Sequence, residues 1–156
     1  MGKIKLYATC KLENVTNLRL PEDDDWYFIL KCSQCGAETE NEVYFNKIEE
    51  HEMEGSRGNA NYIAKCKSCE RKGKISFIKT FPYKIENNEE PQVIAEFESR
   101  GWDIATAVPK GGYICDSTES ETVFKEEVDL QDGDWAEYDE EADVPVGIFD
   151  YKISVD

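Results

Sequence analysis

The chain has 156 residues, a net charge of −16 and six cysteines. A chain of this length buries about two-thirds of its unfolded surface on folding, so it can hold a core without a metal. No apolar run is long enough to cross a membrane, and no secretory signal opens the chain. We therefore expect a protein of the cytoplasm or the nucleus that has no contact with a membrane and keeps its cysteines reduced.

The charge is unevenly distributed. Residues 1–79 contain 13 basic and 13 acidic side chains, whereas residues 80–156 contain 5 basic and 21 acidic ones. Such an acidic chain repels a phosphate backbone, which argues against nucleic-acid binding. An acidic surface suits either solubility or a basic protein partner. A cluster of lysines and arginines around Cys66 leaves RNA binding as a minor alternative.

The first half is predicted to alternate strands with cysteine-containing turns. Residues 3–13 alternate apolar and polar side chains, which predicts a strand whose buried face includes Cys10 as an ordinary core residue. A turn-rich, acidic segment follows. Residues 28–35 and 62–69 then repeat one pattern at an offset of 34 residues: an aromatic residue, an isoleucine, a lysine and a Cys-x-x-Cys pair. Each copy predicts an apolar strand that enters a metal-binding turn, and segment 45–55 between them predicts a short helix.

The two pairs, Cys32/Cys35 and Cys66/Cys69, are the usual donor set for a tetrahedral metal. Two hairpins facing each other across one ion make a zinc ribbon, although the 30 residues between the pairs exceed the common spacing. Four thiolates leave no open coordination position, so we expect one structural Zn²⁺ per chain. Iron in the same site, two disulfides and four ordinary thiols are the alternatives. The single histidine, His51, is a fifth candidate ligand, but a surface position is the simpler prediction.

The second half is predicted to be β-rich after a linker at residues 81–91. Further strands are predicted at residues 93–98, 113–115, 122–130 and 144–155. The acidic segment 132–141 predicts either a partner-binding patch or a solvated loop with Trp135 and Tyr138 packed inward. No window supports a long amphipathic helix.

Together these elements predict a mainly β fold of two β-sandwich or barrel-like halves in a pseudo-twofold relation, with zinc-ribbon-like hairpins in the first half. In this relation residues 7–10 overlie residues 94–97, and residues 27–29 overlie residues 113–115. We interpret 1–156 as a single zinc-binding domain that consists of a first half, 1–80, with the zinc ribbon and an acidic β half, 91–156.

A catalytic role is not indicated. One histidine and scattered carboxylates form no recognisable catalytic constellation, so we expect a non-enzymatic protein without a small-molecule substrate. The closed metal site favours a scaffold or protein-interaction module, whose partner the sequence does not identify. The alternative is a metal-trafficking or thiol-redox protein that uses the same Cys pairs. A hydrolase built on paired carboxylates is a weaker hypothesis.

Several short motifs, spread over nearly the whole chain, occur in the same order as in a known protein family. They are residues 12–18, both Cys pairs, and the segments 55–58, 96–101, 134–140 and 146–148. In these motifs the chain resembles the eukaryotic CXXC-motif-containing zinc-binding protein family. The resemblance implies an all-β fold in two halves, zinc on Cys32, Cys35, Cys66 and Cys69, and no established enzymatic activity. It implies no role for Cys10 or Cys115.

Overall fold

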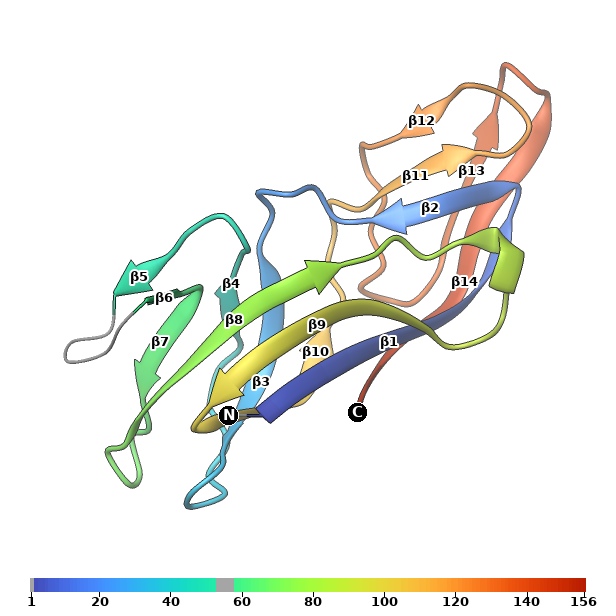
Figure 1. Ribbon diagram of the computed structural model, residues 1–156. Coiled ribbons are helices and arrows are strands. Elements are labelled where there is room, and N and C mark those ends of the chain that lie inside the picture. Colours follow the sequence, from blue (N-terminus) through green and yellow to red (C-terminus); the bar gives the residue numbers. More distant parts are fainter. Residues whose placement is uncertain (1, 53–57) are drawn as a thin grey trace.

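The computed structural model describes residues 2–52 and 58–156, and its regular structure is nearly all β (Figure 1). The strands of the first half are β1 (Gly2–Glu13), β2 (Val15–Arg19), β3 (Trp26–Cys32), β4 (Val43–Phe45), β5 (His51–Glu52), β6 (Asn59–Ala60), β7 (Tyr62–Lys65) and β8 (Lys72–Thr80). Those of the second half are β9 (Gln92–Arg100), β10 (Trp102–Val108), β11 (Ile114–Ser117), β12 (Val123–Phe124), β13 (Trp135–Asp139) and β14 (Val144–Val155). A short 3₁₀ turn, η1 (Ile85–Asn87), joins the halves. Among the described residues no helix is long and apolar enough to span a bilayer.

One six-stranded sheet and two three-stranded sheets hold these strands, apart from β5 and β6, which pair with each other. The six-stranded sheet has the order β13-β14-β1-β9-β8-β7, and it curls along its length (Figure 1). Two three-stranded sheets, β10-β3-β4 and β12-β11-β2, face it. Phe28 of β3 meets Phe97 of β9 edge to face, with ring centroids 5.7 Å apart. The core therefore lies between the curled sheet and the two smaller sheets, and the mainly β prediction is confirmed.

The strand order has an internal pseudo-twofold symmetry. Exchanging β1 with β9, β8 with β14 and β7 with β13 leaves the order of the large sheet unchanged. The same exchange, with β2/β10, β3/β11 and β4/β12, converts one small sheet into the other. The predicted two-half relation is therefore confirmed. Each half also contributes one strand, β2 or β10, to the small sheet of the other half.

The predicted overlay of the two halves is correct in its strands and wrong by one residue in one register. β1 does correspond to β9, and β3 does correspond to β11. The buried positions Phe28 and Leu30 of β3, however, match the buried Tyr113 and Cys115, an offset one residue shorter than the sequence overlay. Because side chains alternate between faces, only the burial pattern fixes this register.

The long alternating strand β1 carries much of the core, as predicted. All five of its inward apolar residues are buried, namely Ile4, Leu6, Ala8, Cys10 and Leu12. Burial of a large apolar side chain stabilises a fold by about 1.5–3 kcal/mol, so this one strand is a major source of stability. Cys10 is a core residue, and its burial raises the pKa of the thiol to about 12.

The predicted helix at residues 45–55 is wrong over its described part. Residue 45 ends β4, residues 46–50 are irregular with a bend at 47–48, and β5 pairs with β6. The Asn46 side-chain oxygen accepts the backbone N–H groups of Ile48 and Glu49, at 3.0 and 2.8 Å. Such a side-chain turn competes with helical hydrogen bonds, which explains the miss. Residues 53–55 of the predicted helix, and most of the sequence motif at 55–58, lie outside the described residues.

Several further segments differ from the prediction. Strand β10 was not predicted, and only residues 123–124 of the strand predicted at 122–130 form a strand, β12. The turn-rich stretch after residue 13 contains strand β2, which pairs with β11 across the two halves. The expected linker is packed, because Tyr83 is fully buried and its N–H and C=O pair with Leu18. The acidic segment 132–141 contains strand β13 rather than a loop. Its Trp135 packs against Phe124, but Tyr138 is 44% exposed instead of packed inward.

Candidate metal centre

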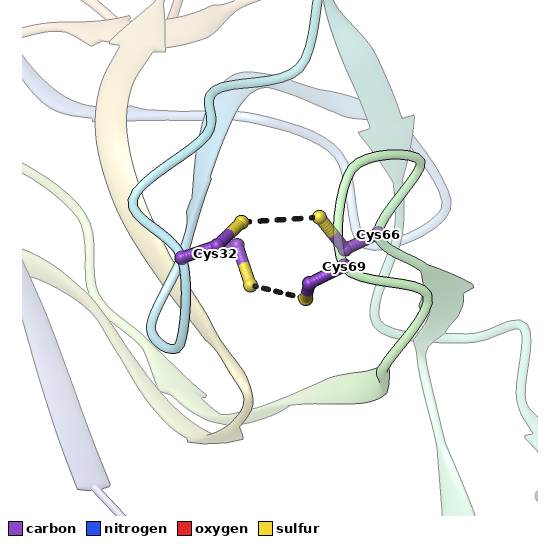
Figure 2. Close-up of side chains that lie close together, drawn as sticks. Cys32, Cys66 and Cys69 are labelled. Carbon is purple, nitrogen blue, oxygen red and sulfur yellow. Dashed lines mark hydrogen bonds between the residues drawn. The ribbon is translucent and has the colours of Figure 1, made fainter.

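Two tight turns present the four cysteines of the paired motifs. The first follows β3, where the Cys32 N–H donates to the Ala37 carbonyl at 2.8 Å. Gly36 takes a φ of +78° in this turn, a value that favours glycine over other residues. The second turn joins β7 to β8, and there the Cys66 N–H donates to the Arg71 carbonyl at 2.9 Å. Both predicted hairpins are therefore present, and their turns face each other (Figure 2).

The sulfur atoms converge on one point. The four Sγ atoms of Cys32, Cys35, Cys66 and Cys69 lie within 4.8 Å of one another. Contacts of 3.6 Å link Cys32 to Cys69 and Cys35 to Cys66, so each contact joins the two hairpins (Figure 2). A tetrahedral zinc–thiolate centre, with Zn–S bonds of about 2.3 Å, places its sulfurs about 3.8 Å apart. A disulfide requires about 2.05 Å. The donor set and its spacing thus fit zinc, and all four cysteines are free.

Backbone hydrogen bonds favour the thiolate form of two of these cysteines. The Cys35 and Gln34 N–H groups point at the Cys32 sulfur and lower the pKa of that thiol to about 6. The Cys69 and Ser68 N–H groups lower the pKa of Cys66 in the same way. For Cys69 the Arg71 N–H also favours the thiolate, but burial and the neighbouring sulfurs outweigh it and raise the pKa to about 11. Metal ligation requires thiolates, so by lowering the pKa of Cys32 and Cys66 the turns favour the form of these ligands that binds zinc.

His51 is not part of the sulfur cluster. It is exposed on β5, and the cluster of metal-binding side chains found among the described residues contains the four cysteines alone. The alternative of a histidine ligand therefore has no support from the geometry. Cys10 and Cys115 are buried in the core, also apart from the cluster.

Sequence reasoning missed the tryptophan that supports the second hairpin. The indole N–H of Trp102, on β10 of the other half, donates to the Ala64 carbonyl at 3.3 Å. The ring lies so close to β8 that a Cβ atom added to Gly73 would be 2.5 Å from the Trp102 Cδ1 atom. Both features are long-range contacts. The only local signal was a glycine within an otherwise regular strand, which often marks a close approach.

Comparisons with known proteins agree with this geometry. A family model described as "CXXC motif containing zinc binding protein, eukaryotic" matches residues 5–156. A relative from Mus musculus with the same description is 41% identical over 153 residues, which covers 96% of this chain and 95% of the relative. Two solved structures share the fold. "Crystal Structure of C1orf123" has a TM-score of 0.93 and 37% identity, and covers 99% of both chains. A hypothetical protein from Plasmodium falciparum has a TM-score of 0.91 and 27% identity, and covers both chains fully.

The match extends over nearly the whole length of the relatives, and it includes the four clustered cysteines. The family description names zinc, and the donor set of four converging sulfurs is one that zinc prefers. The chain belongs to the eukaryotic family of CXXC motif containing zinc binding proteins.

Proposed function

We propose that this protein is a non-enzymatic scaffold whose zinc-stapled hairpin binds an extended, basic segment of a protein partner along strand β7. A zinc ion held by four thiolates has no open position for a substrate, which supports a structural role for the metal. The observation that carries the proposal is the open edge of β7 beside the metal centre, in a groove with an excess of carboxylates.

Among the described residues β7 is the last strand of the large sheet, and its hydrogen-bonding register leaves the backbone groups of Ile63 facing outward. The Cys66 N–H pairs with the Arg71 carbonyl in the β7–β8 ladder. Since hydrogen-bonded pairs alternate in an antiparallel ladder, Ala64 and Tyr62 also direct their backbone groups towards β8. Ile63 therefore presents its N–H and C=O to the open side. An edge of this kind is where an added strand can pair.

Two hollows extend along this edge. One of about 470 Å³ lies towards the cysteine turns, and one of about 700 Å³ lies towards β5. Both are lined by Tyr62, Ala64 and Lys65, so they meet at β7. Their acidic residues are Asp25, Glu38, Glu40, Glu42, Glu49 and Glu52, against the basic Lys65, Lys67 and Lys72. This excess occurs in the half of the chain that is otherwise neutral, so a basic segment complements it.

A library of immobilised extended peptides, with Lys and Arg at varied positions, tests the proposal directly. We expect binding by basic peptides, weakened by Ile63→Pro, because proline removes an outward N–H without breaking the ladder to β8. Ile63→Val is the matched control and should bind normally. Glu38→Lys should weaken binding, whereas Glu86→Lys, on η1, should not. Binding that ignores both Ile63→Pro and Glu38→Lys, or no binding at all, contradicts the proposal.

A metal-trafficking or thiol-redox role is the second candidate, and the exposure of Cys35 favours it. A ligand that solvent can reach gives a competing thiol a route to the ion. Incubation of the zinc-loaded protein with a chelating dye separates the two functions. The scaffold predicts retention of zinc over days, and rapid transfer to the dye supports trafficking instead.

A further inference from the structure

The second half contains a buried carboxylate cluster. Asp139, at the end of β13, is fully buried. Its side chain accepts hydrogen bonds from the hydroxyls of Ser117 and Ser120, at 2.5 and 2.6 Å. It also accepts the backbone N–H groups of Glu141 and Ala142, at 3.0 and 3.1 Å. The carboxylate thus joins the turn after β11 to the turn between β13 and β14.

These two turns occupy the places of the two cysteine turns in the other half. β11 ends at the buried Ser117, as its counterpart β3 ends at the buried Cys32. The turn after Asp139 connects β13 to β14, as the turn after Cys66 connects β7 to β8. Under the pseudo-twofold relation, Ser117 and Ser120 are therefore equivalent to the first Cys pair. Asp139 and Ala142 are equivalent to the second.

The first turn shares two backbone hydrogen bonds between the two halves. The Cys32 N–H donates to the carbonyl five residues later, Ala37, at 2.8 Å, and the Ser117 N–H donates to Thr122 at 2.9 Å. In each half the next residue donates to the turn between the first two strands of the opposite half, at 3.1 and 2.9 Å. Two independent hydrogen bonds thus align the two turns. They differ at one position, because Gly36 has a φ of +78° and donates its N–H to the Cys32 carbonyl at 2.9 Å, whereas the equivalent Glu121 does not have a positive φ.

The second turn matches more closely. The Glu70 N–H donates to the Cys66 carbonyl at 2.8 Å, and the Asp143 N–H donates to the Asp139 carbonyl at 2.8 Å. Glu70 and Asp143 both have a positive φ, of 66° and 60°. Non-glycine residues rarely adopt this conformation, so its recurrence at the same position is specific.

The side chains accept the same backbone donors. The sulfurs of Cys32 and Cys66 accept N–H groups from the residues two and three positions later. The Ser117 oxygen accepts the same two donors of its own turn, both at 3.1 Å, as does the Asp139 carboxylate. The turns of the second half thus contain no paired cysteines, but their side chains accept the same backbone N–H groups as the cysteine sulfurs do.

We propose that the Asp139 cluster is the metal-free counterpart of the zinc centre, and that its turns keep most of the backbone hydrogen bonds of a four-cysteine site. One carboxylate, which accepts the hydroxyls of Ser117 and Ser120 and more distantly that of Thr122, holds the second pair of turns together as zinc holds the first. The second half therefore needs no metal, and cysteines at the four equivalent positions create a second zinc site.

The first test restores the cysteines with Ser117→Cys, Ser120→Cys, Asp139→Cys and Ala142→Cys in one chain. Elemental analysis and native mass spectrometry are expected to find a second zinc ion per chain. The matched control shifts each cysteine by one residue, with Thr118→Cys, Glu121→Cys, Glu140→Cys and Asp143→Cys, and should bind no additional zinc. No second ion in the first variant, or a second ion in both, overturns the proposal.

The reciprocal test exchanges the residues in the opposite direction, so it does not depend on the folding of the first variant. The residues of the Asp139 cluster are moved into the zinc site with Cys32→Ser, Cys35→Ser, Cys66→Asp and Cys69→Ala. Ala37→Thr is added because Thr122, its counterpart, donates its hydroxyl to Asp139 at 3.4 Å. This chain should fold without zinc and melt about 5 °C above the same chain with alanine at position 66, because only the carboxylate accepts both hydroxyls. Equal melting temperatures contradict the proposal.

Discussion

The buried cysteines distinguish the metal centre from ordinary thiols at the scale of single residues. Cys32 and Cys66 are almost inaccessible, and both accept two backbone N–H groups on sulfur. Cys115 is equally buried, but burial raises the pKa of its thiol to about 12. The difference arises from the turns, since the Cys-x-x-Cys backbone supplies donors that a strand interior does not.

Cys66→Ser is expected to abolish stoichiometric zinc binding and to lower the melting temperature. Structural zinc is worth about 10–16 kcal/mol in small peptides, and this larger scaffold should lose less. Elemental analysis and thermal unfolding measure both effects. Cys115→Ser is the control, because a hydroxyl in the core should destabilise the chain while zinc remains bound. Full zinc occupancy in Cys66→Ser would remove that residue from the ligand set.

Asp139 gives a prediction about pH. The hydroxyls of Ser117 and then Ser120 lower the pKa of this carboxyl to about 2, from an ordinary value of 3.8. A depressed folded-state pKa stabilises the fold above the ordinary value, and this contribution is lost as the pH falls towards 2. Asp139→Asn should therefore melt below the wild type at neutral pH, with a difference that shrinks below about pH 4. A constant difference across this range, measured by thermal unfolding, would contradict the assignment.

At the scale of elements, the second hairpin depends on its packing against Trp102. The β7–β8 pair lies over this ring, and the absence of a side chain at Gly73 permits the approach. Gly73→Ala should destabilise the protein by about 1–3 kcal/mol, because its Cβ would overlap the indole. Gly111→Ala is the matched control, since its Cβ would make only ordinary contacts. Gly73→Ala should unfold at a lower urea concentration than Gly111→Ala. Equal midpoints would show that the Trp102 ring can move aside at little cost in stability.

The same scale explains which elements the sequence could predict. β1 and the two cysteine hairpins were predictable because alternation and Cys spacing are local signals. β2 was missed because its partner, β11, lies in the other half of the chain. The helix predicted from residue 45 fails because Asn46 closes a turn of its own. The four sulfurs could be predicted as a set, whereas their support from Trp102 could not, since that contact joins residues 38 positions apart.

At the scale of the whole molecule, the two halves share one sheet and differ in what closes their turns. β1 and β9 pair at the pseudo-twofold axis, and β2 and β10 each join the sheet of the opposite half. A weak sequence overlay predicted the relation but could not give the exchange of strands, which depends on long-range pairing. The first half closes its turns around four sulfurs, and the second closes them around Asp139.

Hydrogen–deuterium exchange of the zinc-loaded and the chelator-stripped protein tests this account most directly. Removal of zinc should increase exchange in the β3–β4 hairpin, residues 26–45, and in the β7–β8 hairpin, residues 62–80. Exchange in residues 114–144, which include the Asp139 cluster, should not change. Faster exchange across both halves, or no change in the two cysteine hairpins, would contradict a zinc ion that staples the first half alone.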